Sequence, residues 1–124
     1  MNLIKRLLSG RHKPEGVPSL KWPGESGKEY RYDIHPLGVP FRPLPGNYIY
    51  AKESDGGCWV PVYIGQTRDL SQRLEGHEQQ DHAIQNGATH IHVHVSAATQ
   101  AARCEEERDL VIRWQPVCND RPES

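Results

Sequence analysis

The chain has 124 residues, of which 35% are hydrophobic and 25% charged, and its formal net charge is -1. This length suits one domain with a modest core, and no stretch approaches the roughly 18 apolar residues of a membrane-spanning helix. We expect a cytoplasmic protein without a signal peptide, because Lys and Arg interrupt its one apolar N-terminal patch. Three cysteines are too few and too scattered for a disulfide framework or a CxxC zinc site.

The first 45 residues predict an irregular, basic N-terminal arm. They carry eight Lys and Arg against four Asp and Glu, whereas residues 46–124 carry seven against twelve. Frequent prolines and glycines suggest that residues 1–45 run extended over the domain, with one short strand near Tyr30–Ile34. A basic arm is compatible with an anionic partner, and equally with a solvated tail. Residues 46–120 should form the folded domain, and residues 121–124 a tail.

A β-hairpin is predicted after residue 45. Asn47–Glu53 has the composition of a strand, the sequence SDGG supplies turn residues, and Cys58–Ile64 reads as the returning strand. Pro61 indicates an edge position or a bulge, because proline cannot donate to a neighbouring strand. Gly65 is expected to let the chain turn from this strand into a helix.

Two helices and a third strand complete the predicted fold. Thr67 can cap a helix from Arg68 to about Gln79, Thr89–Ser96 alternates as a strand, and Ala97 to about Trp114 is helical until Pro116 stops it. The order β-β-α-β-α, with two strands joined by a tight turn, predicts an α+β fold. We expect a small three-stranded antiparallel sheet with packed helices.

The first predicted helix places an arginine on its apolar face. Leu70, Leu74 and His77 follow helical spacing, and Arg73 falls on the same side. Arg73 could reach solvent from the rim of this face while His77 lies at an exposed helix end. Alternatively, the face could line a polar site.

The last predicted helix places a carboxylate on its apolar face. Counting back from the apolar stripe, Glu107 falls on the inward side, whereas Glu105 and Glu106 should face solvent. An inward Arg73 and an inward Glu107 could form a structural ion pair. They could also be two walls of a cleft, since Mg²⁺ needs only one or two carboxylates and an arginine fork suits phosphate oxygens.

Tyrosines mark the predicted strands. Tyr48 and Tyr50 share one face of the first strand, and Tyr63 ends the second. Such tyrosines commonly pack in a core with the hydroxyl at the rim. Here the hydroxyls of Tyr48 and Tyr63 could also converge on the cleft proposed above.

These residues together resemble the GIY-YIG nuclease superfamily, which includes the nuclease domain of bacterial excision-repair endonucleases, phage intron homing endonucleases and some restriction enzymes. The first motif reads Gly46-Asn47-Tyr48 and the second Tyr63-Ile64-Gly65, with Arg73 ten residues after Tyr63. The resemblance covers about residues 43–120, and its closing pattern consists of Glu107, Leu110, Ile112, Trp114, Pro116 and Asn119.

The resemblance implies metal-dependent hydrolysis of DNA phosphodiester bonds. Glu107 would be the one protein ligand of Mg²⁺ or Mn²⁺, which polarises the scissile phosphate, and Arg73 would hold that phosphate. Tyr48 or Tyr63 would activate water, with help from a neighbour because a phenol titrates near ~10. His77 resembles a histidine of some restriction-enzyme members and could take up the tyrosine proton.

Other positions are implied as support or depart from the family pattern. Gly46 and Gly65 would support the site, and Asn119 would fix the end of the last helix and the cleft wall. Asn47 replaces a usually apolar residue, and Gln66 stands where several members have lysine. Because no separate DNA-binding domain fits in the chain, DNA affinity would come from the basic arm or from a separate targeting partner.

Two alternatives remain open at this stage. His90, His92 and His94 face one way on their strand and could contribute two zinc ligands, or they could form a solvated polar face. The acidic body and the missing DNA-binding domain favour a module that binds nucleic acid or a partner with little catalysis.

Overall fold

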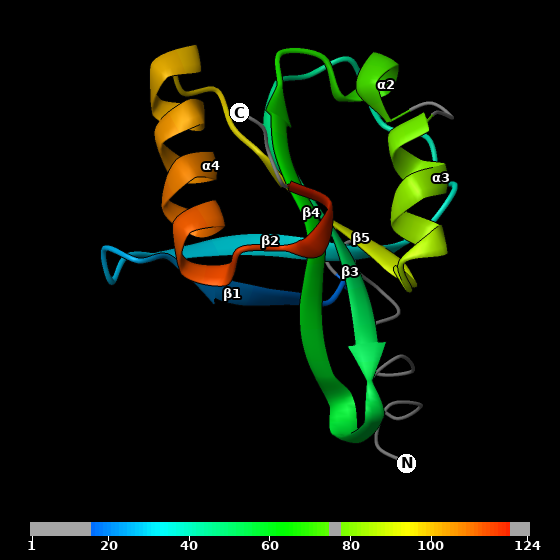
Figure 1. Cartoon of the computed structure of the whole chain (residues 1–124). Helices are drawn as coiled ribbons and strands as arrows, with labels where there is room; N and C mark the ends of the chain where they lie inside the picture. Colours follow the sequence, from blue (N-terminus) through cyan, green and yellow to red (C-terminus); the bar gives the residue numbers. More distant parts are fainter. Residues whose placement is uncertain (1–15, 75–77, 120–124) are drawn as a thin grey trace.

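Five antiparallel strands form one sheet in the computed structural model, which describes residues 16–74 and 78–119 (Figure 1). The strands follow the order β1-β2-β5-β3-β4 across the sheet. Their bounds are β1 Ser19–Pro23, β2 Glu29–Pro36, β3 Gly46–Ser54, β4 Cys58–Thr67 and β5 His90–Val95. The helices are α2 Leu70–Arg73, α3 Glu78–Gln85 and α4 Gln100–Trp114, with short 3-10 turns η2 Asp55–Gly57 and η3 Val117–Asn119.

The class is α+β, but the predicted three-stranded sheet is wrong. The additional strands β1 and β2 come from the arm that we expected to be irregular, and the predicted short strand near Tyr30–Ile34 lies within β2. Strand β2 pairs with β5, with Asp33 opposite Val93. Pro23 and Pro36 end β1 and β2, a position that proline tolerates because no further N–H is needed there. The prolines therefore separate strands rather than exclude them.

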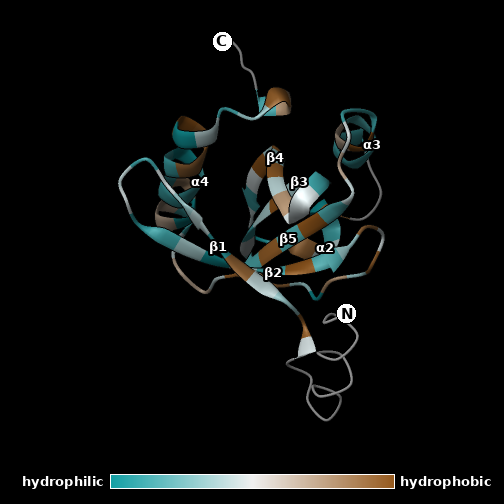
Figure 2. Cartoon of the chain, turned by 90° about the horizontal axis from the view of Figure 1, so that it is seen from below, coloured by the Kyte–Doolittle hydropathy of each residue, from teal (hydrophilic) through white to brown (hydrophobic). Residues whose placement is uncertain are grey.

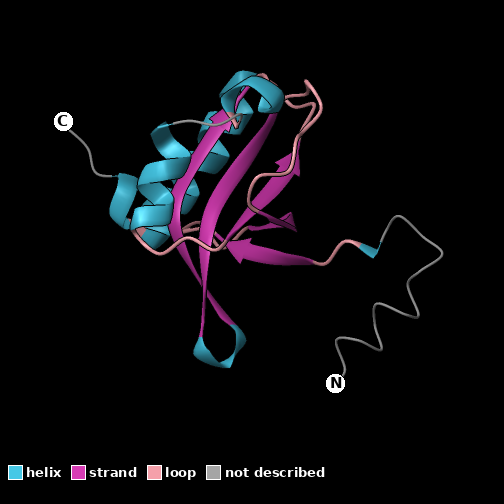
Figure 3. Ribbon diagram, turned by 90° about the vertical axis from the view of Figure 1, so that its right-hand side faces the viewer, coloured by secondary structure: helices cyan, strands magenta, loops and turns pink. Residues whose placement is uncertain are grey.

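The predicted hairpin is present, and its second strand is irregular at Pro61. Tyr50 pairs with Tyr63 but Ala51 pairs with Pro61, so Val62 is an extra residue in β4. Strand β4 also lies at the edge of the sheet. Both features confirm the expectation for Pro61. Figure 3 shows the tip of this hairpin projecting beyond the rest of the sheet.

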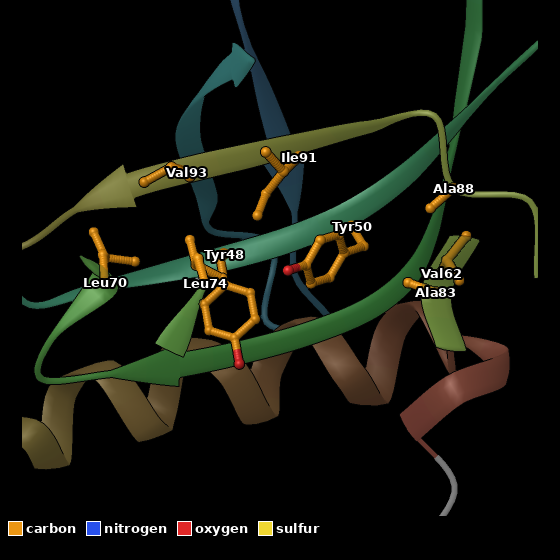
Figure 4. Close-up of a cluster of buried hydrophobic side chains, with 9 residues drawn as sticks. All are labelled: Tyr48, Tyr50, Val62, Leu70, Leu74, Ala83, Ala88, Ile91 and Val93. Atoms are coloured by element: carbon orange, nitrogen blue, oxygen red, sulfur yellow. The ribbon is translucent and has the colours of Figure 1, made fainter. Parts of the chain in front are cut away.

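Both faces of the sheet are covered. Helix α4 lies over one face, and α2 and α3 lie over the other (Figures 1 and 2). The first six residues of β3 are all buried, which is typical of a strand packed on both sides. The cluster beneath α2 and α3 is drawn in Figure 4 and contains Tyr48, Tyr50, Val62, Leu70, Leu74, Ala83, Ala88, Ile91 and Val93. The cluster beneath α4 contains Trp22, Tyr32, Ile49, Ala51, Ile64 and Leu110.

The single helix predicted from Arg68 to Gln79 is wrong. Two helices, α2 and α3, take its place, and Asp69 rather than Thr67 caps the first, accepting hydrogen bonds from the backbone N–H of Ser71 and Gln72. Helix α4 begins three residues later than expected, because Thr99 caps it, and ends at Trp114 as predicted. No helix among residues 16–74 and 78–119 is both long and apolar enough to cross a membrane.

Some predictions fall on residues outside the described ranges. These are His77, the first 15 residues of the predicted arm, and the tail at 121–124.

Candidate functional site

Four of the predicted site residues approach one another near the β4 edge of the sheet. Tyr48 comes from β3, Tyr63 from β4, Arg73 from α2 and Glu107 from α4. The Nη1 of Arg73 donates to the hydroxyl of Tyr48 at 3.5 Å, and the two tyrosine rings lie 6.1 Å apart, centroid to centroid. The charges of Arg73 and Glu107 both act on Tyr63. We use the name cleft for this group of four side chains.

Gly65 makes room for Tyr48 rather than turning the chain. It lies inside β4, directly opposite Tyr48 in the strand pairing. A Cβ atom on Gly65 would come within 2.6 Å of the Cζ and hydroxyl oxygen of Tyr48. The Tyr48 ring therefore lies across Gly65. Figure 4 shows the side chain of Tyr48 pointing from β3 toward β4. Gly46 has a comparable role, because a Cβ there would come 2.5 Å from the carbonyl oxygen of His94.

Arg73 and Glu107 are not a structural ion pair. Among the described residues no salt bridge joins them, although Arg73 is close enough to lower the pKa of Glu107. Partial burial has the larger effect and raises that pKa above the usual range for a glutamate. The carboxylate of Glu107 accepts no hydrogen bond from residues 16–74 or 78–119. The two groups thus both lie near Tyr63 without forming an ion pair with each other.

The tyrosines of this region differ in how deeply they are buried and in how far their pKa values rise. Tyr48 is fully buried, which raises its pKa far above the usual value. Burial and the nearby charge of Glu107 raise the pKa of Tyr63, while Arg73 and a hydrogen bond with Tyr48 oppose the rise. Tyr50 lies farther along β3, and burial raises its pKa to about 12. The partly exposed Tyr63 is therefore the phenol of the cleft that solvent can reach.

Gln79 joins the two phenols of the cleft, which the sequence analysis did not predict. Its Oε1 accepts a hydrogen bond from the hydroxyl of Tyr48 at 3.2 Å. Its Nε2 donates to the hydroxyl of Tyr63, also at 3.2 Å. One signal could have revealed it: Gln79 lies four residues before Ala83, which is fully buried, and so shares its inward face.

Asn119 binds the backbone of the edge strand. Its Oδ1 accepts from the N–H of Ile64 and its Nδ2 donates to the carbonyl of the same residue, each at 2.8 Å. The side chain thus pairs with β4 as a neighbouring strand would, directly beside Tyr63 and Gly65. These two hydrogen bonds hold η3 against β4.

The prediction that Glu106 faces solvent is wrong. We expected it to face solvent, but it is only 7% exposed. The hydroxyl of Tyr32 donates to its Oε2 at 2.6 Å, and His94 Nδ1 lies 2.9 Å from the same oxygen. The carboxylate in turn raises the pKa of His94. Tyr32 belongs to β2, a strand that the sequence analysis did not place in the sheet.

The prediction that the three histidines form a solvated face is also wrong. His92 is fully buried, its Nδ1 accepts a hydrogen bond from Trp22 Nε1 at 3.0 Å, and burial lowers its pKa to about 3. His90 instead contacts Thr89, and His94 contacts Glu106. Within the described ranges no group of three or more His, Cys, Asp or Glu side chains could hold a metal ion. The three histidines therefore do not gather around one zinc position.

Asn47 and Gln66 both hydrogen-bond to Arg103. The buried Asn47 donates from Nδ2 to the carbonyl of Arg103 at 3.0 Å, and Gln66 Oε1 accepts from Nε of Arg103 at 3.2 Å. Arg103 is itself buried and lies one helical turn before Glu107. Asn47, Gln66 and Arg103 thus form one polar contact between the sheet and α4.

Comparison of the chain with protein-family models, with curated proteins and with solved structures found no match.

Proposed function

We propose that this protein is a divalent-metal-dependent endonuclease of the GIY-YIG type that hydrolyses DNA phosphodiester bonds. The observation that carries the proposal is the approach of two phenols, a guanidinium and a carboxylate from four separate elements. Phosphodiester hydrolysis needs a base, a cation that holds the phosphate, and a metal ligand. The cleft supplies candidates for all three: a phenol as the base, Arg73 as the cation and Glu107 as the metal ligand.

Arg73 is the candidate phosphate-binding group. Its side chain is exposed and makes one long hydrogen bond within the described residues, to Tyr48 at 3.5 Å. Most of its N–H groups can therefore turn toward phosphate oxygens. A guanidinium binds such oxygens through two parallel hydrogen bonds and stays charged at every relevant pH.

Glu107 is the candidate metal ligand, and its surroundings fit a hard cation. Its carboxylate is partly buried and accepts no hydrogen bond from the described residues. Mg²⁺ and Mn²⁺ prefer oxygen ligands, and Mg²⁺ usually takes one or two carboxylates and completes its shell with water and phosphate oxygens. Such an ion would polarise the scissile phosphate and stabilise the departing 3′ oxygen.

The DNA itself would be bound mainly through its phosphates. In the described part of the chain all strands belong to one sheet. Phosphate contacts give affinity that falls steeply with salt concentration. We therefore propose weak, salt-sensitive binding to DNA, which a separate targeting partner would strengthen.

Nicking assays with matched variants test this function. The protein is incubated with supercoiled, single-stranded and branched DNA in Mg²⁺, Mn²⁺ or EDTA, beside Glu107→Gln and Arg73→Ala. The control is Glu105→Gln, an exposed glutamate on the same helix. We expect metal-dependent nicking that each site variant reduces by about 10²-fold or more and that Glu105→Gln retains.

Two results would contradict the proposal. Cutting that survives the Glu107 substitution would identify a contaminating nuclease. Salt-sensitive DNA binding without any cutting would identify a binding module instead.

A further inference from the structure

The amide of Gln79 makes opposite hydrogen bonds to the two phenols of the cleft. Its oxygen accepts from the hydroxyl of Tyr48, and its nitrogen donates to the oxygen of Tyr63, both at 3.2 Å. An amide has one acceptor end and one donor end, so it cannot treat the two tyrosines alike. The contact therefore distinguishes between them.

The difference acts on ionisation. An acceptor that receives the O–H of Tyr48 stabilises the protonated phenol, because a phenolate has no hydrogen to give it. An N–H that points at the oxygen of Tyr63 stabilises the phenolate, which is the better acceptor. Gln79 thus favours the neutral form of Tyr48 and the ionised form of Tyr63.

We propose that Gln79 is a positioning residue that assigns the role of general base to Tyr63 and leaves Tyr48 as a neutral hydrogen-bond donor. This inference rests on the proposed nuclease function. It selects one phenol where the sequence motifs leave both open.

The placement of the two rings supports the same assignment. Tyr48 is fully buried, with its ring across Gly65, whereas Tyr63 lies on the edge strand and is partly exposed. Water can reach the hydroxyl of Tyr63 more easily than that of Tyr48. Burial raises the pKa of both phenols, and Tyr48 is the more deeply buried of the two. The titratable groups that face Tyr63 come from β3, α2, α4 and η3 and are Tyr48, Arg73, Glu107 and Cys118.

In the hydrolytic step Tyr63 receives one proton from the attacking water. The phenolate of Tyr63 takes a proton from water, and the oxygen of that water forms a bond to phosphorus. The bond from phosphorus to the 3′ oxygen breaks, its electron pair stays on that oxygen, and a solvent proton completes the 3′ hydroxyl. Tyr63 later returns its proton to solvent, while Arg73 holds the phosphate oxygens throughout.

The chain offers a matched control for Gln79. The next residue, Gln80, accepts a hydrogen bond from Tyr50 at 3.5 Å, and Tyr50 is not part of the cleft. Gln79→Leu and Gln80→Leu remove the same amide from the same helix, one that contacts Tyr48 and Tyr63 and one that contacts Tyr50. Gln79→Glu provides a second test, because an ionised carboxylate accepts hydrogen bonds but donates none.

The experiment combines two measurements on these variants. The nicking rate on supercoiled DNA is followed against pH, and the ionisation of Tyr63 is followed through the ultraviolet absorbance of its phenolate, as the difference between each protein and its Tyr63→Phe derivative. We expect Gln79→Leu and Gln79→Glu to lower kcat by about tenfold at neutral pH and to shift both titrations upward by about one pH unit. KM should not change, and Gln80→Leu should match the wild type.

The tyrosines themselves give the second comparison. Tyr63→Phe should abolish nicking, whereas Tyr48→Phe, which keeps the ring across Gly65, should retain part of it. The reverse order would overturn the assignment, as would identical behaviour of the Gln79 and Gln80 variants. Because the phenolate titration does not depend on cutting, an unchanged titration would overturn the role of Gln79 alone. A wild type that cuts no DNA would overturn the nuclease function as well.

Discussion

Replacing Gly65 with alanine should destabilise the protein, although alanine is normally the better residue in a strand. The new Cβ would lie 2.6 Å from the Cζ and hydroxyl oxygen of Tyr48 and 3.1 Å from its Cε1. Carbon atoms in contact normally stay about 3.5–4.0 Å apart, so the overlap is about 1 Å. Tyr48 is fully buried and cannot move aside freely.

The cost follows from two opposing effects. Overpacking of a well-packed core costs about 1–3 kcal/mol, while removing the flexibility of a glycine with compatible backbone angles gains about 0.4–1 kcal/mol. Gly65 is not among the glycines with positive φ, so alanine meets no backbone strain there. The free energy of unfolding should therefore fall by about 1–2 kcal/mol.

Urea denaturation of a double-mutant cycle measures this effect. In a Tyr48→Val background the ring is absent, and Gly65→Ala should then raise the free energy of unfolding by about 0.5 kcal/mol. The two changes should couple by about 1–3 kcal/mol, as residues in contact do. If Gly65→Ala stabilises the wild-type protein, the ring of Tyr48 does not cover the glycine and the packing described for the cleft is wrong.

Two further predictions concern the face beneath α4. Burial holds the pKa of His92 near 3, whereas an unfolded histidine titrates near 6.5. Between these two pH values only the unfolded state gains a proton. The stability due to His92 is therefore present above pH ~6.5, and the free energy of unfolding falls by about 1.4 kcal/mol per pH unit below it. His92→Gln, which still accepts from Trp22 but does not titrate, should remove this slope from urea melts at several pH values; an unchanged slope would show that His92 is not buried and neutral. Glu106→Ala leaves the buried hydroxyl of Tyr32 without its acceptor and should cost about 1–3 kcal/mol in the same assay, whereas Glu105→Ala should cost almost nothing. Equal costs would contradict the burial of Glu106.

The local elements could be predicted from the sequence because short-range periodicity and turn residues determine them. Strand β3 and the irregular β4, with its turn at the SDGG sequence, follow from alternation and from Pro61. Helix α4 follows from its length and from Pro116. The motif spacing also selected Tyr48, Tyr63 and Arg73 as residues that would lie near one another, and their mutual contacts agree with that selection.

Other features depended on contacts between residues far apart in the chain. Helical periodicity orients Glu107 and Glu106 relative to one apolar stripe, but Glu106 is buried because Tyr32 reaches it from β2, seventy-four residues away in sequence. Gln79 belongs to the cleft because it hydrogen-bonds to Tyr48 and Tyr63, which lie 31 and 16 residues away in sequence. Helical periodicity over a few turns does not indicate these distant contacts.

The histidine strand shows the physical reason most clearly. Alternation in β5 determined that His90, His92 and His94 share one face, as they do. It could not determine whether that face meets water, because the two sides of a strand are equivalent until its neighbours and the covering layer are known. Pairing of β5 with both β2 and β3, and packing of Trp22 and α4 above it, buried His92. The sequence thus determined which side chains point the same way, and the tertiary structure decided which of them lose contact with water.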